Sequence, residues 1–181
     1  MNSMPRLVLT LAAVAIFSAL LLTGVDLWTS PIVEENIAQM HQEVLEEFFP
    51  EMETYQEEMV DEVEYDFVYD DEENFLGVLV HSTASGYGGA IDYYLAVNHE
   101  GIIEGMNIVY HEETPGIGDI VEDPDFQNKF VGKDYEDPIE PEEDIDVVSG
   151  ATDTSEAMID SVREHMDLVS DNILEKGEEL K

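Results

Sequence analysis

The feature that most constrains this chain is an uncharged apolar segment close to its N-terminus, residues 7–25. Its length is close to the roughly 20 apolar residues that one helix needs to cross a bilayer. Trp28 follows at a position typical of the membrane–water interface. The sequence therefore predicts a membrane anchor over residues 7–28. Residues 30–181 remain for one domain with its own hydrophobic core.

The charge beside this segment predicts its orientation. Arg6 precedes the apolar run, so the positive-inside rule places residues 1–6 in the cytoplasm and the domain outside the cell membrane. A cleaved signal peptide is the alternative. The run is long for the apolar core of a signal peptide, and Leu27-Trp28-Thr29 is a poor cleavage site. We therefore favour a retained single-pass anchor.

Acidic residues dominate the rest of the chain. The 44 Asp and Glu against 6 Lys and Arg give a formal net charge of −38, which disfavours binding to nucleic acid. Such a charge is typical of a disordered acidic segment or of a folded surface adapted to high salt. Because 44% of the residues are hydrophobic and the acids lie among periodic apolar positions, we favour a folded, halophilic domain. Calcium binding is a third alternative, although the EF-hand pattern is missing.

The chain has no cysteine, which excludes disulfides and thiolate metal sites.

Hydrophobic periodicity predicts an α+β domain with antiparallel strands and flanking helices. Alternating apolar segments predict two β-hairpins, formed by residues 63–69 with 75–81 and by residues 91–97 with 102–110. Helical spacing predicts one helix that begins at Ser30-Pro31 and ends near Pro50. A second helix is predicted over residues 158–173, with Gly177 as its stop signal.

Two loops contain several glycines. The three glycines of the Gly86-Tyr87-Gly88-Gly89 segment let a ligand approach the backbone, although their spacing fits neither a P-loop nor a dinucleotide fingerprint. In residues 111–118, Pro115-Gly116 favours a tight turn. His111 stands beside two glutamates in this loop, which is too few ligands for zinc. We predict no metal site there.

The most informative short stretch is Ser149-Gly150-Ala151-Thr152, at the entry to the last predicted helix. Unpaired N–H groups and the helix dipole favour a phosphate at such a position, and a nearby hydroxyl can bind or carry it. An ordinary helix cap is the alternative. Asp153 with Glu156, or the hydroxyl of Thr152 or Thr154, would then satisfy the first N–H groups. Local physics favours the cap.

The motifs together resemble a known family. Residues 146–155 resemble the flavinylation motif of the G subunits of Rnf electron-transport complexes and of the C subunits of sodium-translocating NADH:quinone reductases. The glycine loop at 86–89, an Asn-Xaa-Xaa-Gly turn at 98–101 and the His-Xaa-Glu-Thr-Pro-Gly-Ile-Gly segment at 111–118 match further family segments in the same order. Ile117 stands where the family usually has leucine. The length of this chain fits the Rnf G subunit better than the longer C subunit of the quinone reductase.

The resemblance implies a covalent cofactor and a set of residues around it. FMN would be esterified through its phosphate to Thr152. The other residues implied around FMN are Ser149, Gly150 and Ala151 beside the attachment point and Glu113, Thr114, Gly116, Ile117 and Gly118 along the flavin ring. A flavin transferase would be needed to attach the cofactor.

The same resemblance implies an electron carrier without an independent catalytic site. The partners would be other membrane subunits of a complex that couples electron transfer between ferredoxin and NAD to sodium or proton translocation. One alternative is the quinone reductase C subunit or another extracytoplasmic flavin carrier. A non-redox alternative is an acidic surface domain that binds cations or a partner protein and uses Thr152 only as a helix cap.

Overall fold

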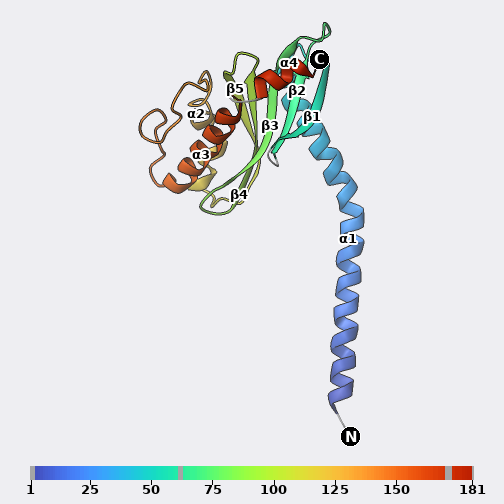
Figure 1. Ribbon diagram of the computed structural model, residues 1–181. Coiled ribbons are helices and arrows are strands. Elements are labelled where there is room, and N and C mark those ends of the chain that lie inside the picture. Colours follow the sequence, from blue (N-terminus) through green and yellow to red (C-terminus); the bar gives the residue numbers. More distant parts are fainter. Residues whose placement is uncertain (1–2, 61–62, 170–172, 181) are drawn as a thin grey trace. The chain divides into compact units, whose positions relative to one another are not determined.

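The computed structural model describes residues 3–60, 63–169 and 173–180 (Figure 1). The chain divides into two compact units, Met1–Glu43 and Val44–Lys181. Residues 1 and 2, which belong to the predicted cytoplasmic N-terminus, lie outside the described residues. The first unit is helical, and the second contains the sheet and the remaining helices.

Helix α1 runs over Ser3–Phe48 without interruption. By length and composition it can cross a membrane, and its apolar residues over positions 7–25 are exposed to the surroundings. The predicted separate helix start at Ser30 is wrong, because Pro31 lies inside α1. Instead of capping a new helix, the Ser30 hydroxyl donates a hydrogen bond to Asp26 Oδ1 one turn earlier, at 3.3 Å. A proline removes one backbone hydrogen bond from a helix, and the turns on either side continue past it here.

Five antiparallel strands form one sheet in the order β1-β2-β3-β4-β5. The strands are β1 Thr54–Val60, β2 Val63–Tyr69, β3 Phe75–Ser85, β4 Ala90–Asn98 and β5 Ile103–His111. The predicted α+β class and both predicted hairpins are confirmed. Strand β1 was not predicted, and β3 continues through residues 82–85, beyond the predicted strand end at residue 81.

The remaining helices follow the sheet in the sequence. They are the 3-10 helix η1 Gly118–Glu122, α2 Pro124–Gln127, α3 Thr152–Leu168 and α4 Leu174–Glu179. Residues 170–172 of the predicted last helix lie outside the described residues. Gly177 does not stop a helix, because it lies inside α4. The absence of a side chain at Gly177 leaves room for Phe75, because a Cβ there would overlap the ring of Phe75.

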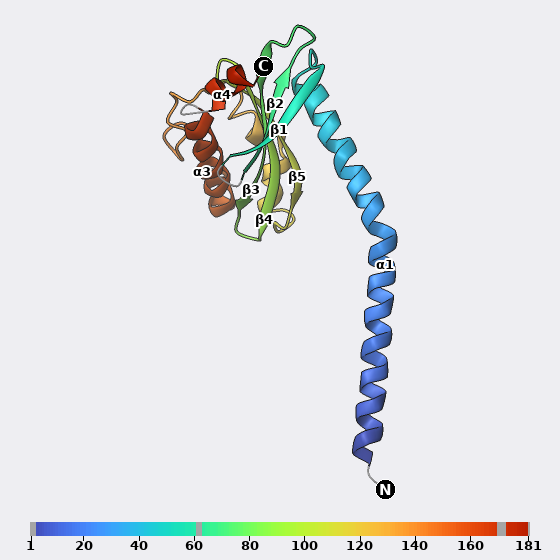
Figure 2. The ribbon, with the colours of Figure 1, turned by 45° about the vertical axis from the view of Figure 1, so that its right-hand side comes forward.

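The sheet is covered on both faces. Helix α3 lies across one face, as the two views show (Figures 1 and 2), and its buried residues Met158, Val162 and Met166 belong to the main hydrophobic core. On the other face the last turns of α1, within the second unit, add Val44 and Leu45 to a smaller core. This arrangement holds α3 against the sheet, so the start of α3 occupies a fixed position beside the loops at one end of the strands.

Candidate functional site

Helix α3 begins without a side-chain cap. Its N-cap residue is Ala151, which makes no side-chain hydrogen bond, and Thr152 is the first helical residue. The predicted caps, Asp153 with Glu156 or a threonine hydroxyl, are therefore wrong. The N–H groups in the first turn of an α-helix have no partner within the helix, and the helix dipole makes this end attractive to anions. The helix start is suited to hold a phosphate group.

The four hydroxyl residues of the motif differ in accessibility. Thr154 and Ser155 are 1% and 0% exposed. Thr154 Oγ1 donates a hydrogen bond to Glu113 Oε2 at 3.1 Å, and Ser155 Oγ accepts one from the Val148 N–H at 3.2 Å. Ser149 and Thr152 are exposed. The structure thus leaves two of these hydroxyls open to modification, and Thr152 is the one at the helix start.

Thr152 faces a hollow that a second, larger hollow adjoins. The first has a volume of about 360 Å³ and is lined by Tyr87, Ile117, Gly150, Ala151, Thr152, Asp153 and Thr154. The second, of about 630 Å³, is lined by Gly116, Ile117, Asp119, Ile120, Glu122, Asp123, Pro124, Val148, Ser149 and Gly150. Ile117 and Gly150 line both. Volumes of this size are typical of cofactor and ligand sites.

The structure brings most of the predicted site residues together at these hollows. They are Gly116, Ile117, Ser149, Gly150, Ala151 and Thr152. Thr114 and Gly118 shape the turn instead, because the Thr114 carbonyl accepts hydrogen bonds from the N–H groups of Ile117 and Gly118. Gly116 has a φ of +80°, a conformation that favours glycine, and its N–H donates to Asp119 Oδ2 at 2.8 Å. The predicted tight turn around Pro115 is confirmed.

Large apolar side chains stand exposed beside Thr152. Tyr87 is 74% and Ile117 is 53% exposed, and both line the first hollow. Exposed apolar side chains next to polar groups are typical of a binding site for a partly apolar ligand. Tyr87 belongs to the segment Gly86 to Gly89, which the resemblance makes a weaker candidate for lining the ring than Glu113 to Gly118. Its position inside the glycine loop was the available signal.

Glu113, predicted to lie along the ring, is only 6% exposed and lies among loops. Its Oε1 accepts a hydrogen bond from the Gly88 N–H at 3.0 Å, and its Oε2 accepts the bond from Thr154. Its own N–H donates to His111 Nδ1 at 3.1 Å, which leaves His111 Nε2 to contact Glu122 Oε1 at 3.2 Å. His111 is thus engaged on both ring nitrogens.

The surroundings of the hollows are acidic. Asp119, Glu122, Asp123 and Asp153 line them. The described lysines and arginines of the second unit all bind oxygens of this chain, in the pairs Lys129 with the Asp146 carbonyl, Lys133 with Asp144, Arg163 with Asp160 and Lys176 with Glu58. The surface near the site therefore presents carboxylates, and the cations are used within the fold.

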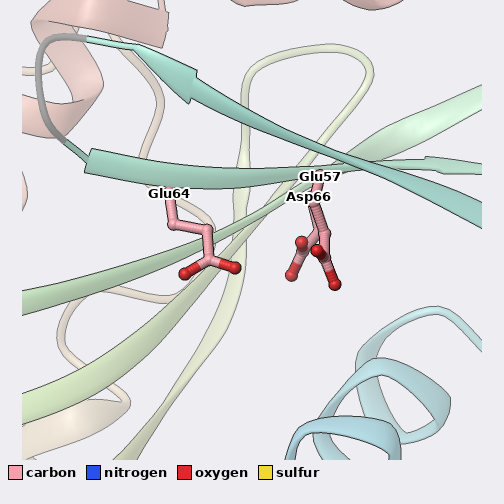
Figure 3. A group of neighbouring side chains, drawn as sticks. All are labelled: Glu57, Glu64 and Asp66. Atoms are coloured by element: carbon pink, nitrogen blue, oxygen red, sulfur yellow. The ribbon is translucent and has the colours of Figure 1, made fainter.

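A second acidic cluster lies on strands β1 and β2, away from these loops. One carboxylate oxygen from each of Glu57, Glu64 and Asp66 lies within 4.8 Å of the other two (Figure 3). Burial, and then the charges of Asp66 and Glu64, raise the pKa of Tyr94 to about 12. Burial and the charge of Glu57 also raise the pKa of Tyr55. The cluster concentrates negative charge on this face of the sheet.

Comparison with known proteins identifies the domain that holds the Thr152 site. Residues 86–167 match the FMN-binding domain family. These residues of the chain are therefore similar to an FMN-binding domain. This match contains the glycine loop, the turn at Pro115 and the start of α3. The resemblance predicted from the sequence motifs is confirmed.

Curated proteins that are similar to this chain include G subunits of oxidoreductase complexes. The chain is 26% identical over 176 residues to the G subunit of the ion-translocating oxidoreductase complex of Methanosarcina acetivorans, covering 91% of this chain and 94% of the relative. It is 33% identical over 101 residues to the G subunit of the proton-translocating ferredoxin:NAD(+) oxidoreductase complex of Clostridium ljungdahlii, covering 52% and 54%. The chain thus spans nearly all of the first relative and about half of the second.

A solved structure is also similar. The crystal structure of Shewanella oneidensis NqrC matches with a TM-score of 0.47 and 30% identity, covering 56% of this chain and 54% of that one.

The residues around Thr152 have features that fit an FMN group. The uncapped start of α3 offers N–H groups to the phosphate, and the exposed Thr152 hydroxyl lies at the same position. Tyr87 and Ile117 offer apolar surface to the flavin ring in the same hollow. The fit rests on features that an ordinary capped helix would not show.

Proposed function

We propose that this chain is the electron-carrier subunit of a membrane-bound Rnf-type complex and holds FMN covalently through a phosphoester to Thr152. The complex would couple electron transfer between ferredoxin and NAD to the translocation of sodium ions or protons. The names of the relatives support this assignment. The observation that carries the attachment site is that Thr152 presents an exposed hydroxyl at the uncapped start of α3, in the hollow that Tyr87 and Ile117 line.

The chain's own residues have distinct tasks in this proposal. FMN, when bound, supplies reversible electron transfer. The first turn of α3 holds the phosphate, while Tyr87 and Ile117 contact the ring and restrict the access of water to it. Thr154 and Ser155 stay engaged in hydrogen bonds, which directs attachment to Thr152. A covalent tether prevents loss of the cofactor outside the cell.

The membrane anchor and the maturation step belong to the same proposal. Residues 7–28 of α1 anchor the domain, and Arg6 favours a cytoplasmic N-terminus, so the flavin domain faces the outside. Other membrane subunits of the complex are its partners there. A flavin transferase attaches the cofactor, because the described residues of the site include no catalytic group for forming the phosphoester.

The test is co-expression of the full chain with a flavin transferase, followed by intact-mass measurement and in-gel flavin fluorescence. We expect a mass increase of one FMN less one water in the wild type, and no increase in Thr152→Val. Ser149→Ala is the matched control, since it removes the other exposed hydroxyl of the motif, and it should keep the flavin. Fluorescence that persists in Thr152→Val and disappears in Ser149→Ala would move the attachment to Ser149.

A further inference from the structure

The carboxylate of Glu113 connects two segments that line the first hollow. It accepts hydrogen bonds from the Gly88 N–H at 3.0 Å and from Thr154 Oγ1 at 3.1 Å. Gly88 follows Tyr87 directly, and Thr154 lies two residues after Thr152 in the first turn of α3. One buried side chain therefore spans the gap between the loop of Tyr87 and the helix start that bears Thr152.

The glycines around this site leave room for Glu113. A Cβ on Gly86 or on Gly118 would overlap the Glu113 carboxylate, and a Cβ on Gly88 would overlap the backbone of Glu112 and Glu113. The sequence suggested that the glycines at 86–89 admit a ligand to the backbone. In the structure they admit the side chains of residues 112 and 113. Three glycines from two loops thus converge on one carboxylate.

We propose that Glu113 is a positioning residue, which fixes the Tyr87 loop and the start of α3 in one geometry and thereby sets the position of the flavin ring relative to Thr152. The proposal rests on the proposed function, because it deepens the role of the same site. Glu113 acts through Gly88 and Thr154 and does not itself contact the ring.

The physical basis is the strength of the two bonds in a buried setting. Hydrogen bonds to an ionised carboxylate are shorter and stronger than bonds between neutral groups. Glu113 is 6% exposed, so water does not replace a lost bond freely. Its removal leaves the Gly88 N–H without its acceptor, and the Tyr87 turn then depends on the Gly86 N–H to Gly89 carbonyl bond at 2.9 Å. The separation between Tyr87 and Thr152 is then no longer held.

The first test uses full-length protein made without a flavin transferase and follows amide hydrogen exchange. We expect exchange at Gly88 to be about tenfold faster or more in Glu113→Ala, because a bond to a charged acceptor is lost. Glu113→Gln retains an acceptor oxygen for Gly88 and should stay within about threefold of the wild type. Glu112→Ala is the matched control, because Glu112 is the residue next to Glu113 and its carboxylate is exposed. Unchanged exchange at Gly88 in Glu113→Ala would overturn the proposal.

The second test measures the rate of flavin attachment by purified flavin transferase and the visible circular dichroism of the attached flavin. We expect attachment to Glu113→Ala to be about tenfold slower, since misplacement by about 1 Å can change rates by that order or more. The dichroism should weaken, and Glu113→Gln should restore both. A purely structural role would lower the melting temperature and leave the attachment rate and the dichroism of the folded fraction unchanged.

A further variant tests the same contact in case Glu113→Ala does not fold. Thr154→Val keeps the volume of the side chain and removes the hydroxyl that binds Glu113. It should slow attachment and weaken the dichroism in the same direction, and wild-type values for both would contradict the proposal. If the wild type takes up no flavin, the proposed function fails. Exchange at Gly88 in the flavin-free variants then still decides whether Glu113 holds the loop.

Discussion

Removal of one charge from the cluster of Glu57, Glu64 and Asp66 should stabilise the domain at low salt and have a smaller effect at high salt. The three carboxylates lie within 4.8 Å of one another on two neighbouring strands (Figure 3). Glu57 and Asp66 are direct cross-strand partners. Like charges opposite each other destabilise a strand pair, and unfolding separates them. Glu57 is the member to change, since its side chain is exposed.

The magnitude follows from Coulomb's law. At a separation near 4.8 Å, two unit charges in water repel by about 0.9 kcal/mol. With Debye lengths of about 10 Å at 0.1 M and about 3 Å at 1 M salt, this falls to about 0.5 and about 0.2 kcal/mol. Glu57 has two such neighbours, so Glu57→Gln should raise the free energy of unfolding by about 1 kcal/mol at 0.1 M and about 0.4 kcal/mol at 1 M. For a domain of this size, about 1 kcal/mol corresponds to roughly 3–5 °C in melting temperature.

The assay is thermal unfolding of the full chain in detergent from 0.1 to 2 M sodium or potassium chloride. The wild type should gain stability steeply over this range, because the net charge of −38 produces many such repulsions. Chloride is the proper anion, since sulfate also strengthens apolar burial. Glu100→Gln is the control variant, because Glu100 is exposed in the turn between β4 and β5 and lies outside the cluster.

Two results would refute this reasoning. Equal effects of Glu57→Gln at 0.1 M and 2 M chloride would show that repulsion within the cluster is not what the variant relieves. A wild-type melting temperature that is insensitive to chloride, but raised by micromolar calcium, would show that the carboxylates bind a cation. The acidic surface would then not be an adaptation to salt.

Four further predictions concern other parts of the molecule. Gly88→Ala should destabilise the domain by about 1–3 kcal/mol in chemical denaturation, since its Cβ overlaps the backbone of Glu113. Gly132→Ala, whose Cβ has open space but whose φ is +84°, should lose about 1 kcal/mol. Burial lowers the pKa of His165 below its ordinary 6.5, so stability present above pH 6.5 should fall as the pH drops below it, and His165→Gln should flatten the dependence in melting curves from pH 7.5 to 5.5. Protease added to intact cells should digest the domain, and protection there with digestion in inverted vesicles would reverse the orientation inferred from Arg6.

The hairpins were predictable because alternating apolar residues report directly on a half-buried strand. Strand β1 was not, since its sequence Thr-Tyr-Gln-Glu-Glu-Met-Val contains two adjacent glutamates and most of its residues are exposed. An edge strand needs little burial, so its pattern resembles that of a solvated loop. The continuity of α1 through Pro31 was also hidden, because a proline preceded by serine is a typical helix start.

The part of the site at the start of α3 was predictable, because a sequence motif marks it. The part formed by loops that are distant in the sequence was less predictable. The motif from Ser149 to Thr152 marks the helix start, but sequence alone favoured a cap that the structure does not form. Tyr87 joins the site because the turn between β3 and β4 lies beside the end of β5, where the Glu112 N–H donates to the Ala90 carbonyl at 2.9 Å. Such proximity comes from strand register, which the sequence expresses weakly.

The missing cap links the fold to the function. Replacing a good N-cap residue by alanine destabilises a helix by about 0.5–2 kcal/mol, and Ala151 holds this position here. Thr154 and Ser155, the hydroxyls nearest to the helix start after Thr152, bind Glu113 and the Val148 N–H instead of the first turn. A phosphate on Thr152 would supply the missing acceptors. Attachment of the cofactor should therefore stabilise α3 as well as load the site, and a protein with flavin should melt at a higher temperature than the same protein without it.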